Sequence, residues 1–132
     1  MKNYFLQNNF SLLAEKNGEI IFSSFEHAIA PALALLGMEN AKGCIVYDKT
    51  VGKAAAVVFV NVGIKFVYAS IMSVTAKEFL EANGVAFECG NLIEKIYNRA
   101  RTDFCPMEKA VISENDPKTA LQKLCEFLGN RE

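Results

Sequence analysis

The sequence predicts an α/β protein with a mainly parallel β-sheet, and three observations support this prediction. Strands and helices alternate after an opening hairpin, a pattern typical of parallel strands joined by helices that cover both faces of a sheet. The hairpin has to add an antiparallel strand to that sheet. The chain has 132 residues, 52% of them hydrophobic, and contains no linker, repeat or low-complexity stretch. We therefore expect one domain over residues 1–132.

A β-hairpin is expected near the start of the chain. Residues 2–9 are compatible with a helical turn or two. The apolar runs 10–16 and 19–24 are separated by Asn17 and Gly18, two residues that tolerate a positive φ. This pair between two apolar runs is the strongest short-range signal for a hairpin.

The later elements begin and end at local signals. Pro31 suits the first turn of a helix that ends at Gly37, and Thr75 with Glu78 forms a capping box. Pro117 suits a first helical position. The expected helices cover residues 28–36, 51–62, 76–83, 91–98 and 118–128, and the expected strands cover residues 43–47, 64–72 and 85–89.

Charge and hydropathy exclude several classes of protein. The chain has 14 Lys and Arg against 15 Asp and Glu, a net charge of −1, so we expect no nucleic-acid partner. No apolar run is long enough to span a membrane, and the first ten residues are too polar for a signal peptide, so a cytoplasmic protein without a membrane partner is expected. The four cysteines lack C-x-x-C spacing, which indicates reduced thiols; Cys44, Cys89 and Cys125 lie in apolar elements and are expected to be buried.

The first candidate site is the turn from Asp48 to Lys53, between a strand and a helix. Free N–H groups and the positive end of the helix dipole favour an anion there, and Gly52 would allow a ligand to approach closely. Lys53 in the first turn opposes the dipole, at a cost of about 0.3 to 1 kcal/mol, unless a negative group binds nearby. The alternative is a solvated lysine beside a helix start, and the spacing does not decide between the two.

The second candidate site is the segment 98–108. Pro106 suits a first helical position, which places Cys105 at the helix N-terminus and Glu108 in the first turn. Such a position, with Arg99 nearby, lowers a thiol pKa, so Cys105 is the most plausible nucleophile of the four cysteines. The alternative is a small buried residue beside a turn proline.

Histidine chemistry has little support in the sequence. His27 is the only histidine, and no nucleophile motif points toward it. A helix-cap or surface role is expected for this residue.

Residues 48–56 and 102–108 resemble the corresponding segments of the domain of unknown function 1893 family. The resemblance extends over residues 10–111 and includes the hairpin, although Ala100-Arg101 departs from the acidic-Gly pair expected there. It implies a cytidine-deaminase-like fold, a three-layer α/β/α sandwich with a mixed five-stranded sheet in which one strand is antiparallel.

Zinc deaminase chemistry is not expected despite the implied fold. The zinc enzymes need His-x-Glu and Pro-Cys-x-x-Cys motifs, but Ile29 stands two residues after His27. The helix that would carry the two cysteines of the second motif begins at residues 48–53, which contain no cysteine. Cys105-Pro106 reverses the required Pro-Cys order. We therefore expect no metal site and no cofactor.

The leading functional hypothesis is a site for an anionic, nucleotide-like small molecule. Lysine and arginine side chains would contact phosphate, while Asp48 and Asp103 would accept hydrogen bonds from hydroxyl or amine groups. The predicted ligand-binding residues are Lys49, Gly52, Lys53, Asn98, Arg99, Thr102 and Asp103.

Two further hypotheses remain open. The protein would be an enzyme if Cys105 acted as nucleophile with Asp48 or Glu108 in acid–base catalysis. It would otherwise be a non-catalytic regulatory or assembly module, for which a homodimer is a reasonable expectation.

Overall fold

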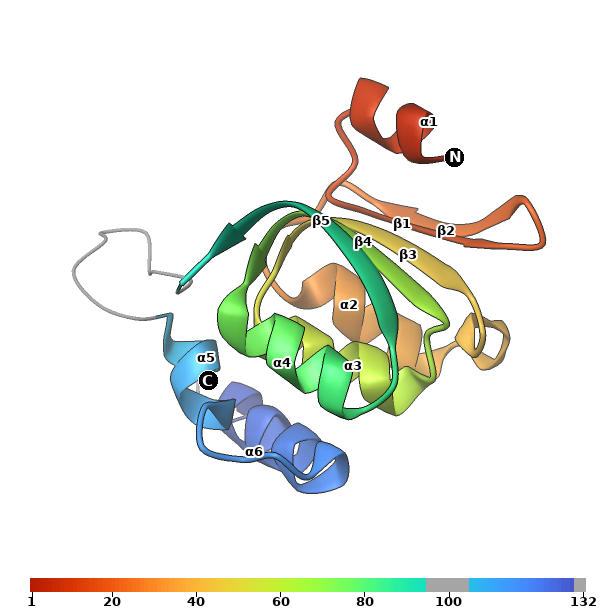
Figure 1. The fold of residues 1–132 in the computed structure, drawn as a ribbon. Helices are drawn as coiled ribbons and strands as arrows, with labels where there is room; N and C mark the ends of the chain where they lie inside the picture. Colours follow the sequence, from red (N-terminus) through yellow and green to blue (C-terminus); the bar gives the residue numbers. More distant parts are fainter. Residues whose placement is uncertain (95–104, 130–132) are drawn as a thin grey trace.

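Five strands form one mixed sheet in the order β2-β1-β3-β4-β5. The computed structural model describes residues 1–94 and 105–129 (Figure 1). β1 is antiparallel to both of its neighbours, while β3, β4 and β5 are parallel. The predicted α/β class and the mixed sheet are thereby confirmed. The strands are β1 (Leu12–Lys16), β2 (Glu19–Ser24), β3 (Ile45–Val51), β4 (Phe66–Ser73) and β5 (Ala86–Ile93).

The predicted hairpin joins β1 and β2. Asn17 and Gly18 both have a positive φ, 54° and 83°, as a two-residue turn between twisted strands requires. The local signal in the sequence was sufficient here because both turn residues can adopt this conformation.

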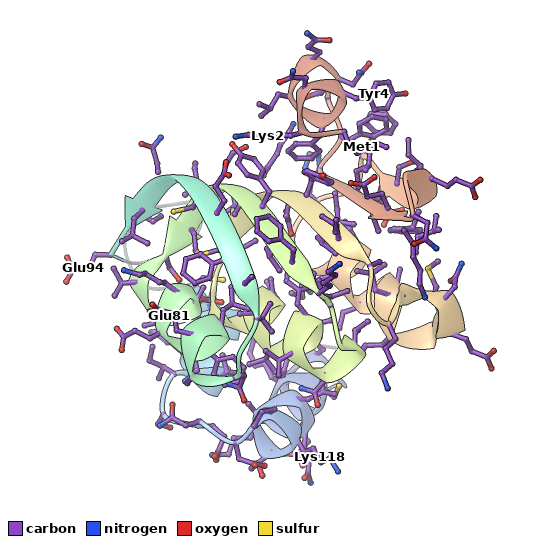
Figure 2. The ribbon with its side chains drawn as sticks, turned by 45° about the vertical axis from the view of Figure 1, so that its right-hand side comes forward. Met1, Lys2, Tyr4, Glu81, Glu94 and Lys118 are labelled. Atoms are coloured by element: carbon purple, nitrogen blue, oxygen red, sulfur yellow. The ribbon has the colours of Figure 1, made fainter. Side chains whose placement is uncertain are left out.

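The helices are distributed unequally over the sheet. In Figure 1, α2, α3 and α4 lie against one face, and α6 packs on α3 from farther out. Of the described helices, α1 alone lies on the opposite face, so Lys2 and Lys118 are on opposite sides of the molecule (Figure 2). The helical segments are α1 (Lys2–Gln7), α2 (Ala30–Ala34), η1 (Leu35–Gly37), η2 (Glu39–Ala41), α3 (Lys53–Val62), α4 (Val74–Ala82), α5 (Pro106–Val111) and α6 (Pro117–Gly129).

The core consists of two clusters on the two faces of the sheet. The larger one surrounds α3, whose residues 53–59 are all buried because the helix lies between the sheet and α6. The smaller one joins Phe5 of α1 to Tyr47 and Tyr68 of the sheet. No helix in the described parts of the chain has the length and apolar character needed to cross a bilayer.

Several predicted element boundaries are wrong. Strand β3 continues through residues 48–51, which were predicted as a turn and the first helical residue, because pairing with β4 continues to Val51, and α3 begins at Lys53. Ser73, not Thr75, caps α4: its Oγ atom accepts a hydrogen bond from the Ala76 N–H at 3.1 Å, and the helix begins at Val74. Strand β5 continues through residues 91–93, where a helix was predicted, because pairing with β4 extends it past Gly90. The rest of that predicted helix, residues 95–98, lies outside the described residues.

The cysteines differ from one another in exposure. All four have free thiols. Cys44 is fully buried, and burial raises its pKa to about 11. Cys89 is partly buried, whereas Cys125 is exposed on α6, so the expectation of a buried Cys125 is wrong.

Candidate functional site

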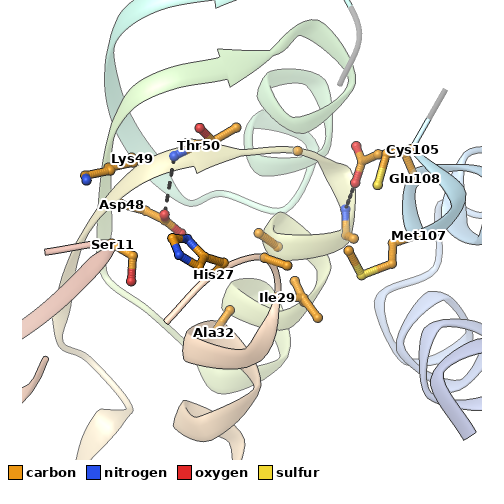
Figure 3. A pocket seen from close by; sticks show the side chains of 14 residues that line it. Ser11, His27, Ile29, Ala32, Asp48, Lys49, Thr50, Cys105, Met107 and Glu108 are labelled. Atoms are coloured by element: carbon orange, nitrogen blue, oxygen red, sulfur yellow. Dashed lines mark hydrogen bonds between the residues drawn. The ribbon is translucent and has the colours of Figure 1, made fainter. Parts of the chain in front are cut away.

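A cleft of about 350 Å³ opens at the carboxyl end of β3. Its walls come from the loop before α2, the end of β3, the start of α3 and the start of α5, which are far apart in sequence (Figure 3). The polar side chains that line it include Ser11, His27, Asp48, Thr50, Cys105 and Glu108. Ligands of open α/β sheets bind outside the carboxyl ends of the strands, so the position of this cleft is that of a binding site.

Asp48 lies in the cleft because of its register in the sheet. It pairs with Leu12 of β1 and Ala69 of β4, two residues of the larger core cluster, so its side chain points to the same face as theirs. The Thr50 N–H donates to Asp48 Oδ1 at 3.3 Å. Loss of solvent raises the pKa of Asp48 to about 7, against the weaker opposing effect of backbone N–H groups. This carboxyl group can therefore gain or lose a proton near neutral pH.

Glu108 closes the N-terminus of α3. Its carboxylate accepts hydrogen bonds from the backbone N–H groups of Lys53 at 2.7 Å and Ala54 at 2.9 Å. The side chain is buried, and burial raises its pKa, while the two amides and the Lys53 charge act in the opposite direction. The sequence predicted that the backbone amides at the start of α3 bind an external anion. In the structure they bind the carboxylate of Glu108 instead.

Gly52 provides the space for this carboxylate. A Cβ atom built on Gly52 would lie 2.6 Å from the carboxyl carbon of Glu108, closer than real Cβ contacts allow. The φ of Gly52 is −98°, which any residue adopts, so the glycine is needed for its lack of a side chain and not for its backbone. The predicted close approach at Gly52 is made by Glu108.

Lys53 points away from the cleft. Its ammonium group donates to the Ile112 carbonyl at 3.1 Å and to Asn115 Oδ1 at 3.4 Å, and it lies 5.5 Å from the centre of the Phe79 ring. Burial lowers the pKa of Lys53, opposed chiefly by the charge of Glu108. The structure therefore does not bring Lys53 together with Asp48.

Lys49 remains at the rim of the cleft. Its Nζ atom donates to Asn9 Oδ1 at 2.6 Å, and its neighbours in β3 are Asp48 and Thr50. Because successive residues of a strand point to opposite faces, Lys49 points away from the face that bears Asp48.

The three predicted catalytic residues line the same cleft. Cys105 is at the N-cap of α5 and is partly buried, close in sequence to Glu108. Glu108 is held by two backbone amides, whereas Asp48 faces the open volume. Four predicted ligand-binding residues lie outside the described residues: Asn98, Arg99, Thr102 and Asp103.

His27, for which the sequence predicted a helix-cap or surface role, is a residue of the cleft. It is exposed and lines the cleft from the loop that precedes α2. Its neighbour Ala28 has a φ of 61°, a left-handed conformation that costs a non-glycine residue about 1 to 2 kcal/mol. The sequence placed His27 in the segment after the hairpin, and the fold brings that segment beside the end of β3.

The donor set of the cleft does not fit the zinc ion of the deaminases. The start of α3 carries Gly52 and Lys53 where thiolates would be needed, and Cys105 is the one thiol in the lining. In the described residues, no three His, Cys, Asp or Glu side chains converge as they do around a metal ion.

Comparison with known proteins identifies the family of the chain. The family described as TM1506, Domain of unknown function (DUF1893), matches residues 1–128. The crystal structure of a DUF1893 family protein (TM1506) from Thermotoga maritima superposes with a TM-score of 0.86 at 27% sequence identity, covering 95% of this chain and 85% of that one. The search of curated proteins found no match. The chain therefore belongs to the DUF1893 family.

Proposed function

We propose that the protein binds a small polar molecule of nucleoside size in the cleft, and that the Asp48 carboxyl group contacts it. The observation that carries this proposal is a carboxyl group with a pKa of about 7 that faces an open cleft at the carboxyl end of a parallel strand. No cation within residues 1–94 and 105–129 forms an ion pair with it. Strongly shifted groups in clefts are typical of functional sites.

The lining favours a ring system with hydrogen-bonding edges. Ile29, Ala32, Ala55 and Met107 give the cleft an apolar wall, against which a flat ring would pack. Asp48 can accept a hydrogen bond when ionised and donate one when protonated, and the His27 imidazole can do either. The volume of about 350 Å³ is near the lower limit of ligand pockets, which favours a nucleoside over a dinucleotide.

The charge of the cleft favours the uncharged part of such a ligand. Asp48 and Glu108 are both acidic, so an anionic group placed between them would be repelled. An anionic group of the ligand would instead face Lys49 at the rim. The proposal includes a relationship to proteins of the cytidine-deaminase-like fold, a three-layer α/β/α sandwich, without their zinc chemistry.

A cysteine-dependent enzyme is the second candidate. The observation in its favour is that Cys105, His27 and Asp48 line one cleft, which places a thiol and two proton-transfer groups around the same volume. Selective alkylation of Cys105 at neutral pH in the folded protein would support it. Labelling of Cys105 no faster than that of exposed Cys125 would count against it.

Binding of the four common ribonucleosides tests the first proposal. We expect at least one to raise the melting temperature of the wild-type protein and to lose at least tenfold in affinity with Asp48→Asn, which keeps the shape of the side chain. Glu39→Gln, at an exposed carboxylate on η2, is the matched control and should leave affinity unchanged. Failure of all four ribonucleosides to bind, or equal binding by Asp48→Asn, would overturn the proposal.

A further inference from the structure

A second cavity, of about 350 Å³, borders the cleft on the other side of β3. It lies between the end of α1 and the carboxyl ends of β3 and β4. Lys49 and Thr50 line both this cavity and the cleft that contains Asp48. The two volumes are therefore neighbours across one short stretch of strand.

The two cavities differ in charge. The cleft has the carboxyl groups of Asp48 and Glu108 in its lining, whereas none of the described residues that line the second cavity is acidic. The second cavity has Lys49 as its cation and neutral polar side chains around it: Asn8, Asn9, Thr50 and Ser70. Such a set of one ammonium group with amide and hydroxyl donors is suited to an anion.

Lys49 retains hydrogen-bonding capacity toward this cavity. Its ammonium group has three N–H donors, and the hydrogen bond to Asn9 Oδ1, at 2.6 Å, uses one of them. Because the oxygen of the Asn9 amide faces the ammonium group, the NH2 group of the same side chain is a further donor. The hydroxyl groups of Thr50 and Ser70 can also donate to an oxyanion.

We infer that the ligand of the cleft carries a phosphate or carboxylate group and that this group binds in the second cavity, at Lys49 and Ser70. This inference rests on the proposed function, because it extends the ligand held by Asp48 across the end of β3. It assigns the ligand to the class of nucleoside monophosphates or similarly sized acids. The anionic group is therefore placed on the opposite side of β3. It does not bind at the start of α3, as the sequence predicted, because Glu108 already binds the amides there.

The test compares each ribonucleoside with its 5′-monophosphate and its 5′-carboxylate by calorimetric titration. We expect the wild-type protein to bind an anionic member of a pair about tenfold more tightly than the nucleoside, an advantage that falls as salt is added. Lys49→Gln should remove this advantage, because it weakens binding of the anionic ligand far more than binding of the nucleoside, and Lys49→Arg should restore part of it. Lys65→Gln, at an exposed lysine outside the lining of both cavities, should change neither affinity.

Chemical-shift changes in an amide NMR spectrum locate the anionic group. The anionic ligand should perturb Asn9, Lys49 and Ser70 in addition to the residues that the nucleoside perturbs. Equal affinity of the neutral and anionic ligands, or an equal loss of both with Lys49→Gln, would overturn the inference while the Asp48 site stands. If no ribonucleoside binds and inorganic phosphate does not shift Lys49 and Ser70, both proposals fail.

Discussion

The carboxylate of Glu108 occupies the space beside Gly52 that a side chain would otherwise fill. It reaches across 55 residues of sequence to the start of α3 and accepts hydrogen bonds from two backbone amides there. Four unsatisfied N–H groups are a property of every helix N-terminus, and a carboxylate satisfies them better than a neutral acceptor. The contact ties α5 to α3 and forms one wall of the cleft.

Gly52→Ala should destabilise the protein. The added Cβ atom would displace the Glu108 carboxylate and leave buried amides without an acceptor, at a cost of about 1 to 3 kcal/mol in the free energy of unfolding. Denaturant unfolding measures this loss. Gly37→Ala is the control, because Gly37 has no atom within 4 Å of its built Cβ, and it should change stability by less than about 0.5 kcal/mol. Equal effects of the two substitutions would contradict the proposed role of Gly52.

Glu108→Gln should also destabilise the protein, by about 1 to 3 kcal/mol. The amide retains one oxygen, but the NH2 group replaces the acceptor that now faces a backbone N–H, and the negative charge at the helix start is lost. The comparison is Glu81→Gln on the exposed face of α4, measured in the same unfolding experiment. A Glu108→Gln protein as stable as Glu81→Gln would show that the amides do not need the carboxylate.

Asp48 should make stability fall as the pH rises. Its pKa is raised from 3.8 to about 7 in the folded protein, so the folded state holds the proton more tightly than the unfolded state. The favourable contribution is complete below about pH 4 and is lost as the pH approaches 7, with a total of up to about 4 kcal/mol. Asp48→Asn should remove this dependence and unfold at higher denaturant concentration than the wild type at pH 8. A wild-type protein whose stability relative to Asp48→Asn does not change between pH 4 and 8 would contradict the raised pKa.

Ala28→Gly should preserve or raise stability. Ala28 pays a penalty of about 1 to 2 kcal/mol for its left-handed backbone, and glycine avoids it while adding about 0.5 to 1 kcal/mol of entropy cost on folding. A net gain of up to about 1 kcal/mol is expected from thermal or denaturant unfolding. Ala32→Gly, in the buried part of α2, should instead lose at least about 1 kcal/mol. A loss with Ala28→Gly as large as that with Ala32→Gly would show that Ala28 is not strained.

Features encoded by neighbouring residues could be predicted from the sequence. The turn at Asn17 and Gly18 has the expected conformation because two adjacent residues determine it. The start of α5 at Pro106 and that of α6 at Pro117 also agree with local signals. The cap of α4 was assigned to Thr75 because Glu78 completes a capping box, but Ser73, two residues earlier, caps the helix by accepting a hydrogen bond from the Ala76 N–H.

The composition of the candidate site depended on contacts between distant parts of the chain. The sequence indicated an anion at the start of α3, and it could not indicate that Glu108 of the same chain would supply it. The orientation of Lys53 was missed for the same reason, because its partners Ile112 and Asn115 are about 60 residues away. His27 has no local motif, and it meets Asp48 because the loop after β2 lies beside the end of β3 in the folded chain.

The role of Asp48 is tested most directly by titration of its carboxyl carbon by 13C NMR, in the free protein and with a bound ribonucleoside. We predict a midpoint near pH 7 in the free protein, and a lower midpoint with a ligand that donates a hydrogen bond to the ionised carboxylate. Asp48→Asn identifies the resonance by its absence. A midpoint near 4, the ordinary value for aspartate, or a midpoint that no cleft ligand shifts, would contradict the central role of Asp48.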